Sequence, residues 1–406
     1  MSIDNNSFIL RLSNEILRVC FEHVAQLDRQ SGCDDYNRRY GSEKERVHLG
    51  SYDQEQINAQ PKGLWSLALT CRRFNSLAMP ILYTTVHLNA RHYFFRTIDD
   101  KQSLLSCIID LKVKCNGQRM NGEVIKTLVT LPNLKRLDLD GVNIDPGEVD
   151  LGPSPEQVGT SSLVEISFWN LRANPEAIKR LLEWPRNLYT FNLDHMTCDN
   201  SNSTEEPNAA YSWDYANLAD ILQSQRQSLR VLKLGWLEDN VNQSAFSTSD
   251  YPQLHTLTLC VNHKSLVSAV SGSHSLKTLI LDLHSRDATR GIYSNIDIFP
   301  VGLIVAAVAR VQGPKLISEP SMFKLERIGF RAFSDDSVSP DQERKCIFGD
   351  YTRKALLIGN LLLVQTFDFQ EFWVGPSGAE YTLDEVRNYC NCDKCIDWKL
   401  DFPGWS

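Results

Sequence analysis

Three cysteines near the end of the chain, Cys390, Cys392 and Cys395, are its most concentrated chemical feature. Thiolates at this spacing can share a Zn²⁺ ion, which takes four tetrahedral nitrogen or sulfur ligands. The fourth ligand would have to come from a distant position, for which Cys346 is the candidate. A single C-x-C-x-x-C is weaker evidence for a zinc site than the doubled C-x-x-C of zinc ribbons. We therefore expect reduced thiols in a terminal segment and no bound metal.

Other motifs of catalysis are absent from the sequence. It has no G-x-x-x-x-G-K-[ST] loop, no G-x-G-x-x-G, no H-E-x-x-H and no G-x-S-x-G, so the usual phosphate, zinc and nucleophile sites are missing. The nine histidines show no metal-ligand spacing. These absences favour a protein that acts by binding, without a cofactor, over an enzyme.

Composition narrows the class of partner. The net charge is −8 without a clustered basic face, which disfavours nucleic acid because its phosphate backbone needs such a face. The longest apolar run, Phe299–Val311, is shorter than the roughly 20 residues that cross a bilayer. The first residues lack the features of a secretory signal. We expect a cytoplasmic or nuclear protein that binds neither membranes nor nucleic acid.

Two helical segments are expected in the first part of the chain. Phe8–Val24 carries apolar residues at four-residue spacing, with Ser13 placed as an N-cap and Glu15 in the first turn, where a carboxylate meets the positive end of the helix dipole. Ala25–Pro61 mixes both charge signs with few large apolar residues, which predicts a disordered loop.

The second helical segment begins at Gly63 and shows an apolar stripe broken by Arg72–Arg73. Pro80 is expected to end this helix, because proline has no N–H to donate and crowds the preceding turn. The residues Thr84–Leu88 alternate and are β-branched, which is typical of a strand.

A six-residue pattern with apolar first, fourth and sixth positions then recurs along the chain. It starts at Ile108, Leu134, Leu163, Leu188, Leu229, Leu254, Leu276, Leu325 and Val364. Five of the intervals between successive starts are 22 to 29 residues long, close to the 20–29 residue period of leucine-rich repeats. Helical patterns lie between the strands, at Glu123–Leu131, Pro175–Trp184, Tyr215–Gln225, Lys264–Val270 and Phe299–Val311. The sequence therefore predicts an α/β fold, an irregular leucine-rich-repeat solenoid shaped as a horseshoe with a parallel sheet.

The two halves of the N-terminal region resemble an F-box of the fungal type. The resemblance rests on Leu12-Ser13-Asn14-Glu15-Ile16-Leu17 with Phe21, and on Leu67-Ala68-Leu69-Thr70-Cys71-Arg72-Arg73-Phe74. Ser13 stands where the family usually has proline, and the polar loop is a long insertion. F-box proteins with degenerate leucine-rich repeats are a familiar class, and the asparagine of the repeat is mostly absent here.

The resemblance implies a short helical F-box over residues 1–83, with the disordered insertion at 25–61. A solenoid over 84–375 and a terminal cap over 376–406 would follow. It also implies docking of apolar anchors on a Skp-type adaptor, and through it on a cullin. The adaptor contacts carried over are Leu12, Ser13, Ile16, Leu17, Leu67, Cys71 and Phe74. The same side chains are alternatively the internal core of a helical cap.

The chain is thus expected to be the substrate-recognition subunit of a Skp–cullin–F-box ubiquitin ligase, holding a client protein on the solenoid. The client-binding candidates are residues that the strand pattern turns away from the core, or aromatic residues at strand ends: Asp138, Asp140, Trp169, Asp194, Lys233, Trp236, Asp282 and Arg331. The alternatives are an F-box scaffold that delivers no client, and a leucine-rich interaction module outside the ubiquitin system.

Overall fold

The computed structural model describes residues 9, 12–39, 62–88, 102–115, 122–144, 150–195, 213, 215–235, 246–260, 275–283, 326–332, 370–374 and 380–381. They belong to two compact units, one of Met1–Lys114 with Val129–Asp138 and one of Cys115–Leu128 with Leu139–Ser406. The expected boundary after residue 83 lies within the first unit. No helix in the described ranges has the length and apolarity needed to cross a bilayer.

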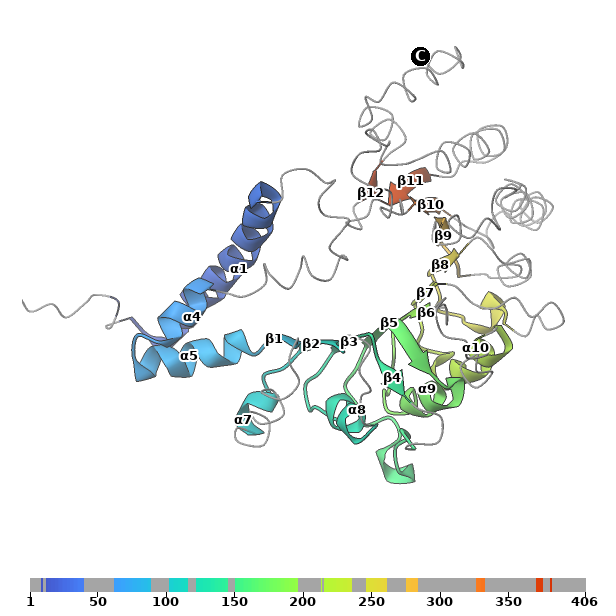
Figure 1. Cartoon of the computed structure of the whole chain (residues 1–406), viewed down its shortest axis with the longest axis horizontal. Coiled ribbons are helices and arrows are strands. Elements are labelled where there is room, and N and C mark those ends of the chain that lie inside the picture. Colours follow the sequence, from blue (N-terminus) through green and yellow to red (C-terminus); the bar gives the residue numbers. More distant parts are fainter. Residues whose placement is uncertain are drawn as a thin grey trace, which may run out of the picture. The chain divides into compact units, whose positions relative to one another are not determined.

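The first unit begins with the helices α1 (Asn14–Arg39), α4 (Lys62–Ala68) and α5 (Arg72–Leu82), drawn in blue in Figure 1. They share a buried apolar cluster of Leu17, Phe21, Ala25, Leu64, Ala68, Phe74, Leu77 and Ala78. At its centre, the rings of Phe21 and Phe74 meet edge to face with centroids 5.2 Å apart, a favoured arrangement of aromatic pairs. Helices α4 and α5 are only 7 and 11 residues long, too short to be stable alone, so they depend on this core shared with α1.

Helix α1 starts where the sequence predicts and extends further than expected. The Ser13 hydroxyl accepts a hydrogen bond from the Ile16 N–H at 3.4 Å, as an N-cap does. The pKa of Glu15 is lowered, chiefly by its backbone N–H and also by Ser13. The disordered loop expected from Ala25 onwards is wrong for residues 25–39, which are helical, and its remainder, 40–61, lies outside the described residues. Ala25 is buried against the cluster, which extends the helix beyond the apolar pattern.

The second helical stripe is divided into two helices at Cys71. Its backbone is extended, with φ −158° and ψ 165°, and its sulfur accepts a hydrogen bond from the Phe74 N–H. The expected end at Pro80 is wrong, because α5 continues to Leu82. Pro80 removes one helical hydrogen bond, but the Tyr83 N–H still reaches the Met79 carbonyl at 3.0 Å, which closes the last turn.

Two polar groups tie these helices together across long sequence distances. The Asp28 carboxylate of α1 accepts hydrogen bonds from the N–H groups of Gly63 and Leu64, at 3.1 and 3.0 Å, and so caps α4. A Cβ on residue 63 would lie 3.0 Å from the carboxylate, so glycine permits this approach. The Arg73 guanidinium donates to the Asn14 side chain at 3.0 Å and to the Leu12 carbonyl.

The rest of the first unit is built from strands. The strand predicted at Thr84–Leu88 is confirmed as β1 (Thr85–Leu88), which pairs in parallel with β2 (Asp110–Lys114). The short helix α7 (Gln102–Leu105) precedes β2. Strand β3 (Arg136–Asp140) follows β2 in the sheet, and its Arg136 forms an ion pair with Asp110.

The second unit holds a mostly parallel sheet with the strand order β5-β6-β7-β8-β9-β10-β11-β12. Its strands are β5 (Glu165–Ala173), β6 (Thr190–His195), β7 (Val231–Leu234), β8 (Thr256–Cys260), β9 (Thr278–Leu283), β10 (Arg327–Ala332), β11 (Gln370–Val374) and β12 (Glu380–Tyr381). Strand β12 is antiparallel to β11, and β4 (Asn143–Ile144) pairs with β5. Together with its helices, this sheet makes the protein α/β.

Strand pairing aligns equivalent positions of the six-residue pattern. The third position of each pattern stands opposite the third position of the next, as Glu165–Thr190, Thr190–Val231, Val231–Thr256, Thr256–Thr278 and Thr278–Arg327. The patterned residues are buried, among them Phe191 at 0% and Leu232 at 0% exposure. The last strand differs, because Arg327 pairs with Gln370. The expected strand Val364–Phe369 lies outside the described residues.

The helices α8 (Gly122–Val129), α9 (Pro175–Leu181) and α10 (Tyr215–Ile221) occur where the sequence predicts helical patterns. Those at Lys264–Val270 and Phe299–Val311 lie outside the described residues. In Figure 1, α9 and α10 lie beside one another on one side of the strands. Short 3₁₀ turns occur at Pro155–Gln157, Gln223–Gln225 and Thr248–Asp250.

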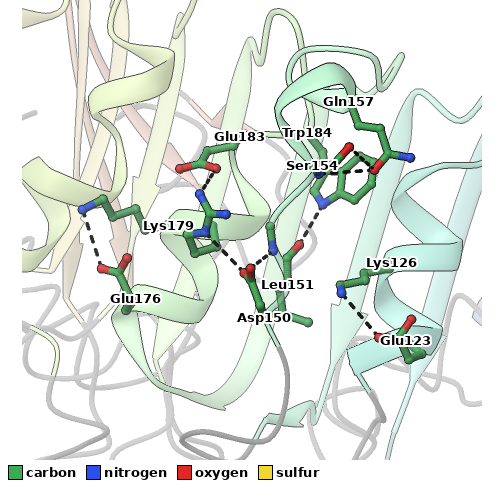
Figure 2. Close-up of polar contacts among 12 residues, drawn as sticks. Glu123, Lys126, Asp150, Leu151, Ser154, Gln157, Glu176, Lys179, Glu183 and Trp184 are labelled. Atoms are coloured by element: carbon green, nitrogen blue, oxygen red, sulfur yellow. Dashed lines mark hydrogen bonds and ion pairs between the residues drawn. The ribbon is translucent and has the colours of Figure 1, made fainter.

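A segment that begins at Asp150 lies between α8 and α9 in Figure 2. The Trp184 indole N–H donates to the Leu151 carbonyl at 2.7 Å in a buried position. Arg180 binds Asp150 at 3.3 Å and also pairs with Glu183. The pKa of Asp150 is lowered, first by the Gly152 N–H and then by Arg180. These contacts hold the segment that leads into β5.

Buried Gln225 joins two successive connections of the second unit. Its Oε1 accepts a hydrogen bond from the Leu188 N–H at 2.9 Å, and its Nε2 donates to the carbonyls of Leu182 at 2.8 Å and Pro185 at 3.1 Å. Buried backbone groups need such partners. One side chain therefore satisfies three backbone groups of the preceding loop.

We predict that Gln225→Ala lowers the free energy of unfolding by about 2–4 kcal/mol, because it leaves these three backbone groups without that partner. Gln223→Ala is the matched control, since Gln223 is exposed on the same 3₁₀ turn. Urea unfolding measures both variants. Equal stability of the two would contradict the role given to Gln225.

We also predict that Asp28→Ala lowers the free energy of unfolding by about 1 kcal/mol, the usual effect of losing a helix cap. Exposed Gln26 of the same helix supplies the control Gln26→Ala, which should be neutral. Amide hydrogen exchange at Gly63 and Leu64 gives a local readout. Protection of these two amides that is unchanged in Asp28→Ala would refute the cap.

Candidate protein-interaction surfaces

The helices of the first unit have apolar side chains on two sides. One side forms the buried cluster, and the other is exposed: Ile16 at 50%, Val19 at 64%, Trp65 at 52% and Leu69 at 70%. On α1 the exposed residues Ile16 and Val19 are three positions apart, which places them on one side of the helix. Trp65 and Leu69 are four apart, and the Leu69 N–H donates to the Trp65 carbonyl at 3.2 Å. We call these four side chains the exposed apolar set.

The expected adaptor contacts fall on both sides of the helices. Leu17 and Phe74 belong to the buried cluster, while Leu12 and Leu67 pack against it and are half-buried. Ser13, Ile16 and Cys71 are exposed. Leu17 and Phe74 thus have a structural role here, and the reading of these side chains as the core of a helical cap fits them. Adaptor contact remains a prediction for the expected residues as a group.

Sequence reasoning gave no binding role to Val19, Trp65 and Leu69. The signal that could have found them is the count of apolar residues on α1 and α4, which exceeds what one buried face can hold. Exposed large apolar side chains that group together mark interaction sites in soluble proteins. The exposed apolar set therefore adds three positions to the candidate surface.

The client-binding candidates are less uniform than the strand pattern predicts. Asp138, Trp169 and Lys233 are half-buried on the sheet, and Asp138 lies 4.0 Å from the Lys112 ammonium. Asp140 was expected to be exposed and is only 7% exposed. Its carbonyl accepts the Cys115 N–H at 2.7 Å, and the next N–H, that of Gly141, donates to the Trp169 carbonyl. Chain on both sides of residue 140 leaves its carboxylate little access to a partner.

Other expected site residues lie where their side chains are not described. Trp236, Cys390, Cys392 and Cys395, with Cys346, are outside the described residues, and Asp194, Asp282 and Arg331 are placed by their backbone alone. In the described ranges, no three His, Cys, Asp or Glu side chains gather in a way that suits a metal ion. The described cysteines Cys20, Cys71, Cys107 and Cys115 are not joined in disulfide bonds.

In the second unit, the fifth positions of the six-residue pattern form a row across the sheet, on the side that the pattern turns away from the apolar core. This row is close-packed and mostly uncharged. Ser167 pairs with Asn192, Asn192 with Lys233, and Lys233 with Thr258. Ser167, Asn192 and Thr258 are at most 7% exposed, because their neighbours in adjacent strands cover them. Lys233 is half-buried between them. This row offers little accessible surface to a partner.

Comparison with known proteins adds no relative. No protein-family model matches the sequence, and no curated protein matches it.

We predict that Leu69→Asp leaves the melting temperature within about 1 °C of the wild type, because an exposed position loses little on substitution. Its neighbour Ala68 is 3% exposed in the cluster, so Ala68→Asp buries an unpaired carboxylate and lowers the melting temperature by many degrees. Differential scanning calorimetry compares the two. Equal melting temperatures would show that α4 does not present these two sides as described.

Proposed function

We propose that this chain is the substrate-recognition subunit of a Skp–cullin–F-box ubiquitin ligase. In this proposal the helices α1, α4 and α5 act as an F-box that docks on a Skp-type adaptor. The sheet and helices that follow act as a leucine-rich-repeat solenoid that holds a client protein. The subunit contributes proximity, by raising the local concentration of client lysines near the ubiquitin-charged enzyme.

One observation carries the proposal: the exposed apolar set lies on helices whose own core is complete. Phe21, Phe74 and Leu77 already fill the shared cluster, so Ile16, Val19, Trp65 and Leu69 are not needed to hold the helices together. Recognition by apolar anchors on helices is a common way to bind a partner protein. Ile16 and Leu69 of this set lie in the two segments that resemble an F-box, which supports a Skp-type adaptor as that partner.

Two further features support the assignment. Ser13, which replaces the proline usual in the family, caps α1 with its hydroxyl, so the helix has a defined start without that proline. The in-register alignment of repeat positions across β5 to β10 supports a repeat architecture, since repeats bury their cores against neighbouring repeats.

Co-purification with the Skp-type adaptor tests the proposal. We expect the wild-type chain to retain the adaptor, and Ile16→Asp/Leu69→Asp to lose it, because each substitution places a carboxylate in an apolar contact. The control Gln223→Asp/Gln227→Asp adds the same charge at two exposed positions of the second unit and should bind normally.

The remaining outcomes decide between the alternatives. Failure of the wild-type chain to bind the adaptor would reject the F-box assignment and leave an interaction module with a helical cap. Adaptor binding without client ubiquitylation in a reconstituted ligase would favour the scaffold. Retention of the adaptor by Ile16→Asp/Leu69→Asp would reject the exposed apolar set as the docking surface.

A further inference from the structure

Three cationic or titratable residues occupy equivalent positions just before neighbouring strands of the second unit. Arg230, His255 and Lys277 each immediately precede a strand, β7, β8 and β9 respectively. The His255 N–H donates to the Arg230 carbonyl at 2.9 Å, and the Lys277 N–H donates to the His255 carbonyl at 2.9 Å. The three residues are therefore direct neighbours across the sheet, and we call them the basic row.

The residues on either side define the ends of the row. Tyr189 comes before Arg230, whose N–H donates to the Tyr189 carbonyl at 2.9 Å, and the Arg230 guanidinium carbon lies 4.3 Å from the centre of the Tyr189 ring. At the other end, the Lys277 ammonium lies 3.3 Å from the Glu326 carboxylate. A cation over a ring is held in place while its edge N–H groups stay free to donate.

The side chains of the basic row are accessible to a partner. Arg230 is exposed, His255 is half-exposed, and the side chain of Lys277 is 59% exposed. The ion pair of Lys277 with Glu326 is itself exposed, so it contributes little and can be exchanged. The described residues include no carboxylate paired with Arg230. The row thus presents positive charge in a protein whose net charge is −8.

His255 lies between the two cations of the row. Burial lowers the pKa of its imidazole, and the charges of Arg230 and Lys277 lower it further. The Thr256 hydroxyl lies 3.0 Å from its Nδ1. The imidazole is therefore neutral at pH 7, and an anion bound beside it would raise its pKa and favour the charged form.

We infer that the basic row binds an extended acidic segment of a partner protein, with aspartate or glutamate side chains at alternate positions. Adjacent strands are about 4.8 Å apart, so the three side chains span about 10 Å in a line. An extended peptide places alternate side chains roughly 7 Å apart on one side, so three of them span about 14 Å. The long arginine and lysine side chains at the ends of the row would have to cover the difference. A single phosphoryl group is held best by donors that converge on one point, and these residues are spread out.

The inference deepens the proposed function and rests on it only for the identity of the partner as a client. It assigns the client contact to the edge of the sheet where the strands begin. The client-binding residues expected from the sequence lie within or after the strands, so they did not point to this edge. Lys233, an expected client contact, lies three residues after Arg230 on the same repeat.

Binding of a labelled peptide to the full chain tests the inference, with fluorescence anisotropy as the readout. The probe is a ten-residue peptide with aspartate at alternate positions, and its twin carries asparagine there. We expect the aspartate peptide to bind at low salt and to weaken as salt rises, because exposed charges are screened. Arg230→Ala/Lys277→Ala should weaken binding about tenfold, as expected for two lost charge pairs.

The control Lys126→Ala/Lys179→Ala removes two positive charges from the helices α8 and α9 and should leave peptide binding unchanged. Equal weakening by both variants, or equal binding of the asparagine peptide, would overturn the inference. Tighter binding of a peptide with one phosphoserine and no aspartate would also overturn it in favour of phosphopeptide recognition. Circular dichroism confirms that each variant is folded.

The pH dependence gives a second readout. Because the bound carboxylates raise the pKa of His255, affinity should be highest below that pKa and fall as the pH rises through it. The groups around His255 are Arg230, Lys277 and the Thr256 hydroxyl, with Glu326 beyond Lys277. His255→Gln should abolish the change in affinity between pH 5.5 and 7.5, and an unchanged profile would exclude His255 from the site.

Adaptor binding, measured on the same variants, separates this inference from the proposed function. Failure of the wild-type chain to bind the aspartate peptide, with the adaptor retained, counts against the basic row alone. Peptide binding without adaptor binding counts against the ubiquitin-ligase role and leaves the acidic-peptide site intact.

Discussion

The stacking of buried apolar residues across parallel strands is the interaction on which the second unit depends. Each six-residue pattern supplies one strand, whose buried side chains pack beside those of the next strand. Phe191, Leu232 and Leu257 occupy equivalent positions in β6, β7 and β8 and are all at 0% exposure. A slip by one residue would turn these side chains to the opposite side of the sheet. The register is therefore set by the apolar pattern, and it also decides which polar residues become neighbours.

Polar side chains supply hydrogen bonds to backbone groups that apolar packing leaves without partners. The connections between strands vary in length and leave backbone groups without partners in the sheet. Gln225 satisfies three of them, and the Trp184 indole binds the Leu151 carbonyl. In the first unit, Asp28 caps a helix that starts 34 residues later in the sequence. These contacts fix the connections, so that surfaces on them keep a defined form.

The chain presents two kinds of surface that suit protein partners. One is apolar and lies on short helices that share a completed core, and the other is cationic and lies where three strands begin. Apolar anchors supply much of the affinity in protein interfaces, whereas charge complementarity chiefly supplies specificity and speed of association. In the proposed function, the apolar surface would bind the adaptor and the cationic surface would bind the client. The described residues bring together no cluster of metal-ligating side chains.

The sequence by itself determined the strands β1 to β3 and β5 to β10, most of the buried positions on them and the Ser13 cap, because these depend on local spacing and side-chain chemistry. Tertiary structure decided which apolar side of α1 is buried, since Ile16 and Leu17 are both apolar and only packing separates them. It also made residues 25–39 helical and buried Asp140. The basic row depends on it most of all: Arg230, His255 and Lys277 are far apart in the chain and become neighbours only through strand pairing. Contacts between distant residues follow from register and packing, which the local sequence at each position does not contain.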